Sequence, residues 1–564
     1  MLRFIAIIFL NSIVFLYLKF FTPGMIEFDL TGKEITGFIE DSFNMFIFQA
    51  DLDDKYESRK STYDIENITL RLVINPDEKK VYGQENLHLR IIKPDFHDYT
   101  IFDCGKNIQV KRVFNSTGNL FFFQKDNYLF VRTPMGMRDN LNINIDYEFN
   151  FEDKFYKGFI FDQEQNHFYT LSEPNFSRYW FISKVDPSDK FFAEVELITP
   201  KNLVSVSNGI LVDSFLINEN FRYFKYKSIY PVNHYLLFVA GGKYKVIKDI
   251  YVDYKSSDTL RYEHFVFNES FERAKDDLEL LKVIYERLKK YLGDYPFKKE
   301  LYGIVEVTWP FGGMEHQTRS AISSMAFKGL YSEYSLQAHE FAHQWFGNYV
   351  TCKTWKDIWL NEGFATYFEN LAYQSSDEEG SIELPDEYFY GSVYKNKGFV
   401  FSKTVYDKGA WILKMLRDEV GDEKFFKIIS EYLEQYKFLS ASSEDFISIC
   451  NRISGRNLNW FFNQWLYSET AMPVYEVKYN SEKKEIDYLC SVMIRQIQSG
   501  QRFRANLKLQ VIFEDNSEKN FFLVNEGEQI VSFRSSKKIN QVILDPENRI
   551  LKRVIYQQKI EKLN

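Results

Sequence analysis

The chain has 564 residues, enough for about three or four domains. Hydrophobic residues make up 45% of it, which supports buried cores and excludes a chain that is disordered throughout. The formal net charge is -9, and a mixed acidic surface argues against nucleic-acid binding, which needs a concentrated basic face. The four cysteines lie far apart and no pair has CxxC spacing, so a cysteine-based zinc site is not expected.

The N-terminal stretch differs in kind from the rest of the chain. Arg3 precedes a mostly apolar run over residues 4–17, and Lys19 follows. A basic residue followed by about 15 mostly apolar ones is typical of an export signal. No A-x-A-like cleavage site follows, so we predict an uncleaved anchor over residues 4–21, with the rest of the chain outside the cytoplasm. The alternative is a buried N-terminal strand, and with it a cytoplasmic protein.

Three patterns of hydrophobicity divide the remaining chain. Ile68, Leu70, Leu72 and Ile74 alternate with other side chains, as expected for antiparallel strands with one buried face. From Ser270 apolar residues recur every three or four positions, which predicts a helix with Ser270 as its N-cap and Gly293 as its stop. Further helical patterns cover residues 335–346, 358–373, 408–419 and 423–435, and alternation returns after Pro473. The predicted segments are a signal or anchor at 1–24, a linker at 25–62, a β domain at 63–245, a mostly helical domain at 246–468 and a second β domain at 469–564.

The most specific motif is His339-Glu340-Phe341-Ala342-His343, within a helical pattern. Two histidines at i and i+4 lie on one helix face, about 6 Å apart at Cβ. Both imidazoles can therefore reach one metal ion at about 2.0–2.1 Å. Glu340 is placed to touch a water beside the metal. The alternative is a pair of histidines on a solvated helix face.

A third ligand follows downstream. Glu362 lies 19 positions after His343 among the apolar residues Trp359, Leu360 and Phe364. A carboxylate in such surroundings is costly unless it is paired or binds a metal. Glu369, two helical turns further on the same face, is placed to orient a ligand histidine, unless it is a solvated surface carboxylate.

These motifs resemble the zinc-binding stretch of the M1 family of metallopeptidases, the aminopeptidase N and leukotriene A4 hydrolase group. The family pattern is HExxH, eighteen residues, then Glu, and residues 339–365 match it. The flanking residues 344–348 and 359–363 match as well. The resemblance implies one Zn²⁺ per chain, with His339, His343 and Glu362 as ligands.

The same resemblance implies residues that bind the substrate. Gly312-Gly313-Met314-Glu315 is similar to the family motif Gly-x-Met-Glu-Asn, whose backbone lies along the substrate and whose Glu binds the free α-ammonium. His316 replaces the usual Asn: protonated, it would repel the ammonium, and neutral, it would serve as a hydrogen-bond partner. Glu173 matches a second ammonium-binding carboxylate, and its alternative is an exposed loop residue. Tyr406, ahead of Lys408-Gly409, matches a tyrosine that donates to the developing oxyanion, where otherwise we would expect a core tyrosine.

The resemblance covers residues 63–550 and implies a multidomain α+β fold. We expect a β-rich, saddle-like N-terminal domain, a thermolysin-like, mostly helical catalytic domain and a small C-terminal β-sandwich, with no large C-terminal helical domain. The implied function is a zinc-dependent aminopeptidase that releases N-terminal residues from peptides with a free N-terminus. Water activated by the metal attacks, with Glu340 as general base and Tyr406 as oxyanion stabiliser. The alternatives are a non-catalytic scaffold and a hydrolase with another main substrate, such as an epoxide.

Overall fold

The computed structural model describes residues 55–558, except 135, 137–138, 152–156, 255–257, 330–332, 374–388, 390 and 396–399. The predicted anchor over residues 4–21 lies outside the described residues. In the described part of the chain, no helix is both long and apolar enough to cross a membrane. The chain forms two compact units: a larger unit of residues 50–383 and 422–456, and a smaller unit that includes residues 384–421 and 457–564.

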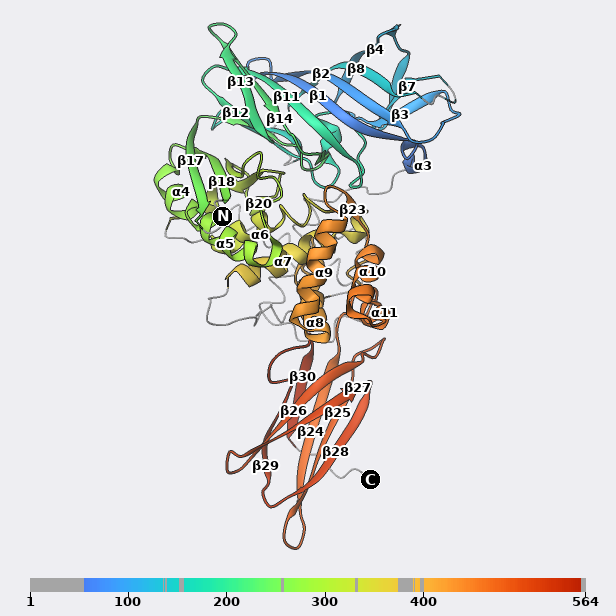
Figure 1. Ribbon diagram of the computed structural model, residues 1–564, viewed down its shortest axis with the longest axis vertical. Coiled ribbons are helices and arrows are strands. Elements are labelled where there is room, and N and C mark those ends of the chain that lie inside the picture. The colour runs from blue at the N-terminus through green and yellow to red at the C-terminus, as the bar shows by residue number, and fades with distance from the viewer. Residues whose placement is uncertain are drawn as a thin grey trace, which may run out of the picture. The chain divides into compact units, whose positions relative to one another are not determined.

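A nine-stranded sheet dominates the first half of the larger unit (Figure 1). Ile68, Leu70, Leu72 and Ile74 of one central strand are all buried, so the predicted alternation is confirmed. The strands run in the order β13 (Ile210–Leu216), β14 (Phe221–Lys227), β11 (Lys190–Pro200), β1 (Tyr63–Asn75), β2 (Lys80–Ile91), β8 (Leu141–Asn150), β4 (Gln109–Asn115) and β5 (Gly118–Asn119), and β15 (Val232–Asn233) pairs with β11.

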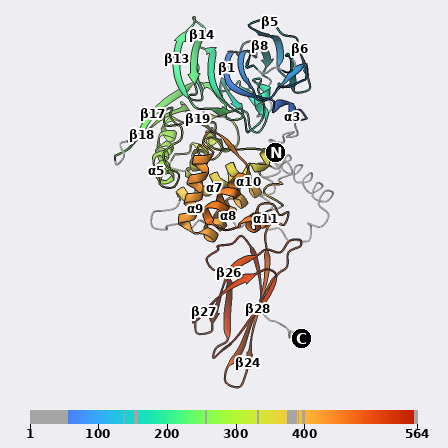
Figure 2. The same cartoon turned by 45° about the vertical axis from the view of Figure 1, so that its right-hand side comes forward.

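Two smaller sheets and two short helical pieces accompany it (Figure 2). One sheet has the order β12 (Val204–Ser207), β16 (Val239–Gly242), β10 (His167–Leu171) and β9 (Gly158–Asp162). The other has the order β3 (Tyr99–Asp103), β7 (Tyr128–Arg132) and β6 (Phe122–Lys125), with α3 (Glu57–Lys60) and the 3₁₀ turn η1 (Phe176–Tyr179) as short helical pieces. Strand β10 ends two residues before Glu173, so this part of the fold delivers a predicted site residue.

A five-stranded sheet lies within the stretch that the sequence predicted to be mostly helical. Its order is β17 (Tyr244–Asp253), β18 (Asp258–Phe267), β19 (Gly303–Val307), β21 (Arg319–Ser323) and β20 (Gly313–Met314). The prediction missed this sheet because β17 has no clean alternation: Val246-Ile247 and Ile250-Tyr251 are neighbouring apolar pairs. Strand β20 carries the glycine motif, so the sheet places the predicted substrate-binding segment.

The helices of the larger unit follow the predicted periodicity. The helix predicted from Ser270 is divided at Glu279 and ends at Gly293, whose φ of 80° confirms the predicted stop. Ser270 occupies the predicted N-cap position, but its hydroxyl donates to the Glu306 carboxylate (2.6 Å) and makes no cap bond. The helices are α4 (Phe271–Leu278), α5 (Leu280–Leu292), α6 (Tyr334–Ala342), α7 (Trp359–Tyr373), α9 (Asp422–Gln435) and α10 (Ser443–Ser454), joined by the 3₁₀ turns η2 (Ser324–Ala326) and η3 (Trp355–Asp357) and by the short pair β22 (Thr351–Cys352) and β23 (Ser440–Ala441).

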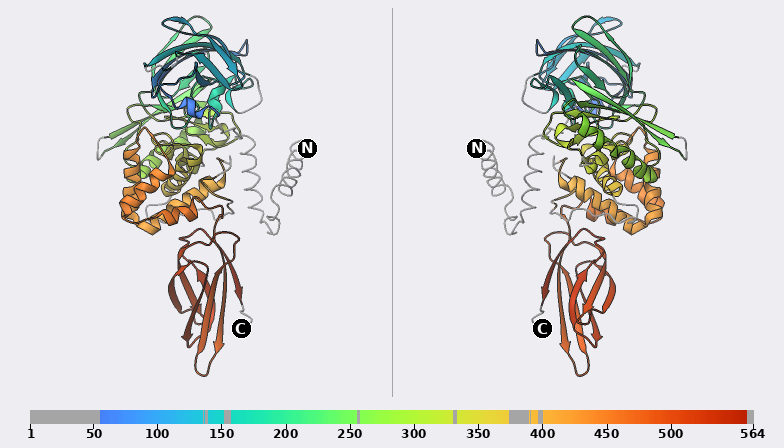
Figure 3. Two further views of the ribbon diagram at one scale, coloured as in Figure 1. Left: turned by 90° about the vertical axis from the view of Figure 1, so that its right-hand side faces the viewer. Right: turned by 90° about the vertical axis from the view of Figure 1, so that its left-hand side faces the viewer.

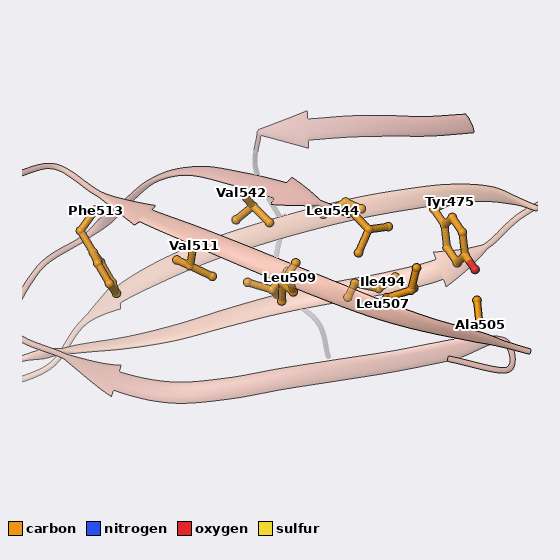
Figure 4. Packing of buried hydrophobic residues seen from close by; sticks show 11 residues of the cluster. Tyr475, Ile494, Ala505, Leu507, Leu509, Val511, Phe513, Val542 and Leu544 are labelled. Carbon is orange, nitrogen blue, oxygen red and sulfur yellow. The ribbon is translucent and has the colours of Figure 1, made fainter. Parts of the chain in front are cut away.

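The smaller unit contains the helices α8 (Lys403–Val420) and α11 (Asn459–Trp465) and two antiparallel-rich sheets (Figure 3). Tyr475, Ile494, Leu509 and Val511 belong to one apolar core between the sheets (Figure 4). The sheets have the orders β28 (Glu528–Ser535), β25 (Tyr488–Gln496), β24 (Val474–Lys483), β30 (Arg553–Gln558) and β27 (Glu518–Asn525), β26 (Ala505–Phe513), β29 (Ile539–Leu544). Because burial alternates along strands such as β26, the period-two pattern after Pro473 is explained. The predicted domain boundaries remain predictions.

Candidate metal centre

Helices α6 and α7 bring the three predicted metal ligands together. His339 lies in the last turn of α6, His343 directly follows the helix, and Glu362 lies in the first turn of α7. The two Nε2 atoms are 3.0 Å apart. Glu362 Oε2 lies 3.5 Å from Nε2 of His339 and 3.2 Å from Nε2 of His343. A tetrahedral ion with bonds of about 2.0–2.1 Å needs ligand atoms roughly 3.3 Å apart, so the three side chains fit zinc.

The outer nitrogen of each imidazole contacts an acceptor. His339 Nδ1 lies 3.0 Å from Oε2 of Glu369, and His343 Nδ1 lies 2.9 Å from the Phe346 carbonyl oxygen. When each Nδ1 donates its proton to that acceptor, both Nε2 lone pairs face the centre of the group. Two lone pairs at this separation repel each other unless a cation lies between them. Glu369 thus lies within hydrogen-bond distance of a predicted ligand imidazole, and its orienting role remains a prediction.

The surrounding carboxylates favour positive charge at this point. Burial lowers the pKa of His343, but Glu315 and Glu362 raise it, with a net result of about 9. Burial raises the pKa of Glu362, but the two histidines lower it to about 2, so this carboxylate is ionised. An ionised carboxylate and two imidazoles form the donor set of a catalytic zinc site.

Glu340 is buried beside the metal ligands. Its side chain packs against Gly313, where an added Cβ would lie 2.3 Å from Glu340 Oε1. Glu340 is only 4% exposed, and its Oε2 has no hydrogen-bond partner within the described residues. Burial raises the pKa of Glu340 to about 8 against the effect of the two histidines. An unpaired buried carboxylate near a metal site is suited to exchanging a proton with a bound molecule.

A second group of carboxylates adjoins the first and shares Glu362 with it. Oxygen atoms of Glu173, Glu315 and Glu362 all lie within 4.8 Å of one another. Glu173 is 5% exposed, so the alternative of an exposed loop carboxylate is wrong. Oε1 of Glu173 and Oε1 of Glu315 have no hydrogen-bond partner in the part of the chain that the structure describes. Burial raises the pKa of both side chains, and neighbouring carboxylates raise it further. A cation bound among these carboxylates would favour their ionised form.

His316 is fully buried and stacks on Phe238, with ring centroids 4.2 Å apart. Burial lowers its pKa to about 3, so the ring is neutral near neutral pH. Of the two alternatives for His316, burial favours the neutral ring. Neither ring nitrogen has a hydrogen-bond partner among the described residues, so the hydrogen-bonding role remains a prediction.

The glycine motif forms strand β20 and its approach. Gly312 is exposed, Gly313 is half-buried, and Met314 is buried and pairs with Ala321. Sequence reasoning assigned no role to Gln344 and Asn348, although both side chains donate to the Glu315 carbonyl oxygen. The available signal was two amide side chains just after the HExxH motif.

Tyr406 lies in the first turn of α8, in the smaller unit, and its side chain is half-buried. Lys408 is fully buried and donates to the Gly391 carbonyl oxygen (3.2 Å). This contact holds the start of α8 against its own unit. The role of Tyr406 remains a prediction.

An HExxH helix followed by a helix that supplies a glutamate ligand, beside a five-stranded sheet, defines the class of HExxH metallopeptidases. Residues 278–398 and 391–465 match the peptidase family M1 domain. The chain therefore carries an M1 peptidase domain, and the resemblance drawn from the motifs is confirmed.

Curated relatives are similar over part of their length. Aminopeptidase M1 of Arabidopsis thaliana is 26% identical over 356 residues, which cover 58% of this chain and 39% of that protein. Probable aminopeptidase 2 of Sulfurisphaera tokodaii is 29% identical over 340 residues, or 55% of this chain and 42% of that protein. Glutamyl aminopeptidase of Mus musculus is 26% identical over 337 residues, which cover 55% of this chain and 35% of that protein. The chain spans about two fifths of the length of these relatives.

Among solved structures, a mutant M1 zinc metallopeptidase from Deinococcus radiodurans bound to a Tyr-Ser-Ala substrate is similar, with a TM-score of 0.62. It is 20% identical, and the alignment covers 73% of this chain and 96% of that one. This likeness establishes the fold.

Proposed function

We propose that this chain is a zinc-dependent aminopeptidase that releases N-terminal residues from peptides. One observation carries the proposal: the zinc-type triangle of His339, His343 and Glu362 shares Glu362 with a buried carboxylate group. A metal site beside buried carboxylates would recognise a peptide by its free ammonium. The presence of an M1 domain and the names of the curated relatives support the same function.

Each group of site residues has a separate role in the proposed reaction. His339, His343 and Glu362 would hold the zinc ion, which would supply Lewis acidity toward a substrate carbonyl and a water. Glu340 takes the proton of the attacking water and passes it to the leaving amine. Glu173 and Glu315 hold the substrate ammonium and thereby fix the cleaved bond at one residue from the end. Gly312 and Gly313 leave the backbone open to the substrate.

Tyr406 is the proposed donor to the oxyanion. Its support is the sequence motif at the start of α8. We expect Tyr406→Phe to lower kcat by about 10²–10³ while zinc content stays unchanged, because one stabilising donor is lost. An unchanged kcat would remove Tyr406 from this scheme.

A panel of aminoacyl-amide fluorogenic substrates tests the function, with and without a chelator and with N-acetylated counterparts. We expect hydrolysis of the free-amine substrates only, abolished by the chelator and restored by zinc. Absence of hydrolysis across the panel would favour the non-catalytic scaffold. Efficient cleavage of acetylated substrates would indicate an endopeptidase instead.

Export or membrane anchoring through residues 4–21 is a further proposal, which rests on the sequence alone. Membrane fractions of cells that express the full chain should then retain the protein through a high-salt wash. A variant that starts after residue 24 should be released, and retention of that variant would exclude the proposed anchor.

A further inference from the structure

The main chain of Glu315 is held by two buried amide side chains. Asn348 Nδ2 donates to the Glu315 carbonyl oxygen at 2.7 Å, and Gln344 Nε2 donates to the same oxygen at 3.2 Å. Both amide side chains are fully buried. A carbonyl oxygen has two lone pairs, so these two bonds use its full accepting capacity.

Both donors belong to the turn that carries a metal ligand. Gln344 directly follows His343, and the Asn348 backbone N–H donates to the His343 carbonyl oxygen (3.1 Å). Lys190 of β11 holds this turn from outside by donating to the Asn348 carbonyl oxygen at 2.7 Å. The backbone of Glu315 is thus fastened to the segment that places His343, and Glu315 Oε1 lies 3.8 Å from His343 Nδ1.

The segment between the paired strands β20 and β21, which begins with Glu315, is also held at its other end. The Thr318 N–H donates to Gln344 Oε1 at 3.0 Å, and Thr318 has a φ of 65°. Asn208 Nδ2 donates to the Gln317 carbonyl oxygen at 2.7 Å, and the Gly209 N–H donates to the Thr318 hydroxyl at 3.0 Å. A positive φ at a threonine persists only where the surroundings fix the backbone, and these bonds do so.

We propose that Gln344 and Asn348 are positioning residues for recognition of the peptide end. They fix the Glu315 carboxylate relative to His343 and Glu362, and so set the distance between the substrate ammonium and the metal. That distance decides which peptide bond reaches the metal. The inference rests on the proposed function, because it assumes that Glu315 binds an ammonium.

A matched pair of hydroxamates tests this role on the zinc-loaded full chain. Leucine hydroxamate carries an α-ammonium, and 4-methylpentanohydroxamate lacks it, while both bind zinc through the same group. For Asn348→Ala and Gln344→Met we expect the affinity for leucine hydroxamate to fall about 3–10-fold, the usual range for one lost hydrogen bond. The affinity for the amine-free probe should stay within about twofold of the wild type, and KM for aminoacyl substrates should rise more than kcat falls.

Asn370→Ala is the matched control, since Asn370 Nδ2 donates to the Thr366 carbonyl oxygen (2.8 Å) within α7. It should change neither affinity. Gln344→Glu serves as a second variant, because it keeps the acceptor for Thr318 and removes the donor to Glu315. Equal loss of both probes, or an unchanged preference for the amine, would overturn the positioning role. A wild-type protein without preference for the amine would instead overturn the proposed function.

Discussion

Glu340 is the side chain on which the proposed chemistry depends most directly. Its Oε2 is buried and free of hydrogen bonds to the described residues, one position after the ligand His339. Glu340→Gln should lower kcat by about 10²–10⁴, because an amide cannot accept the proton of water. Zinc content should stay at one per chain, measured by elemental analysis beside the kinetics. Glu333→Gln is the control and should retain activity, because it changes a carboxylate at the start of α6 that pairs with Lys328.

Glu369 Oε2 lies 3.0 Å from Nδ1 of the predicted ligand His339. Glu369→Ala removes the acceptor of His339 Nδ1 and leaves the Ser335 hydroxyl without its carboxylate partner. We expect zinc affinity to fall about 10–100-fold, since such outer partners orient the ligand imidazole. Competition with a chromogenic chelator measures this affinity. Wild-type affinity in the variant would mean that His339 is held by packing alone.

At the scale of elements, the turn after α6 links the two ligand helices. Gly347 has a φ of 123°, and an added Cβ would lie 3.2 Å from His343 Nδ1. Gly347→Ala should therefore cost about 1–3 kcal/mol of stability through backbone strain and also weaken zinc binding. Gly293→Ala separates the two effects, because Gly293 has a φ of 80° and no atom within 4 Å of the added Cβ. That control should lower Tm without changing zinc affinity, and equal zinc affinities in both variants would contradict the predicted contact.

Features that depend only on residues close in the sequence could be predicted from the sequence. The spacing of His339 and His343 determines a shared helix face, and Gly293 ends α5 because its positive φ suits glycine. The N-cap position of Ser270 was predictable, but its hydroxyl donates to Glu306, 36 residues away, instead of capping the helix. The bonds from Gln344 and Asn348 to Glu315 likewise join segments about thirty residues apart, and no periodic pattern encodes such pairs.

At the scale of the whole molecule, buried neutral histidines make the free energy of unfolding depend on pH. His264 is 2% exposed and accepts a bond from the Ile304 N–H (3.0 Å). Burial, together with the charge of Arg319, lowers its pKa to about 3, and burial lowers that of His167 to about 4. The unfolded chain takes up these protons below its ordinary value of 6.5, whereas the folded chain does not. Stability should therefore fall as pH drops from 6.5 toward 4.

His264→Asn tests this linkage, because an asparagine offers an acceptor in place of Nδ1 and does not titrate. Each buried neutral histidine should cost about 2 kcal/mol of unfolding free energy between pH 7.5 and pH 5. The variant should thus lose about 2 kcal/mol less than the wild type over this interval, measured by denaturant unfolding of the zinc-loaded protein at both pH values. If His264→Asn ran parallel to the wild type, His264 would also take up a proton in the folded state, and its burial would not limit stability in acid.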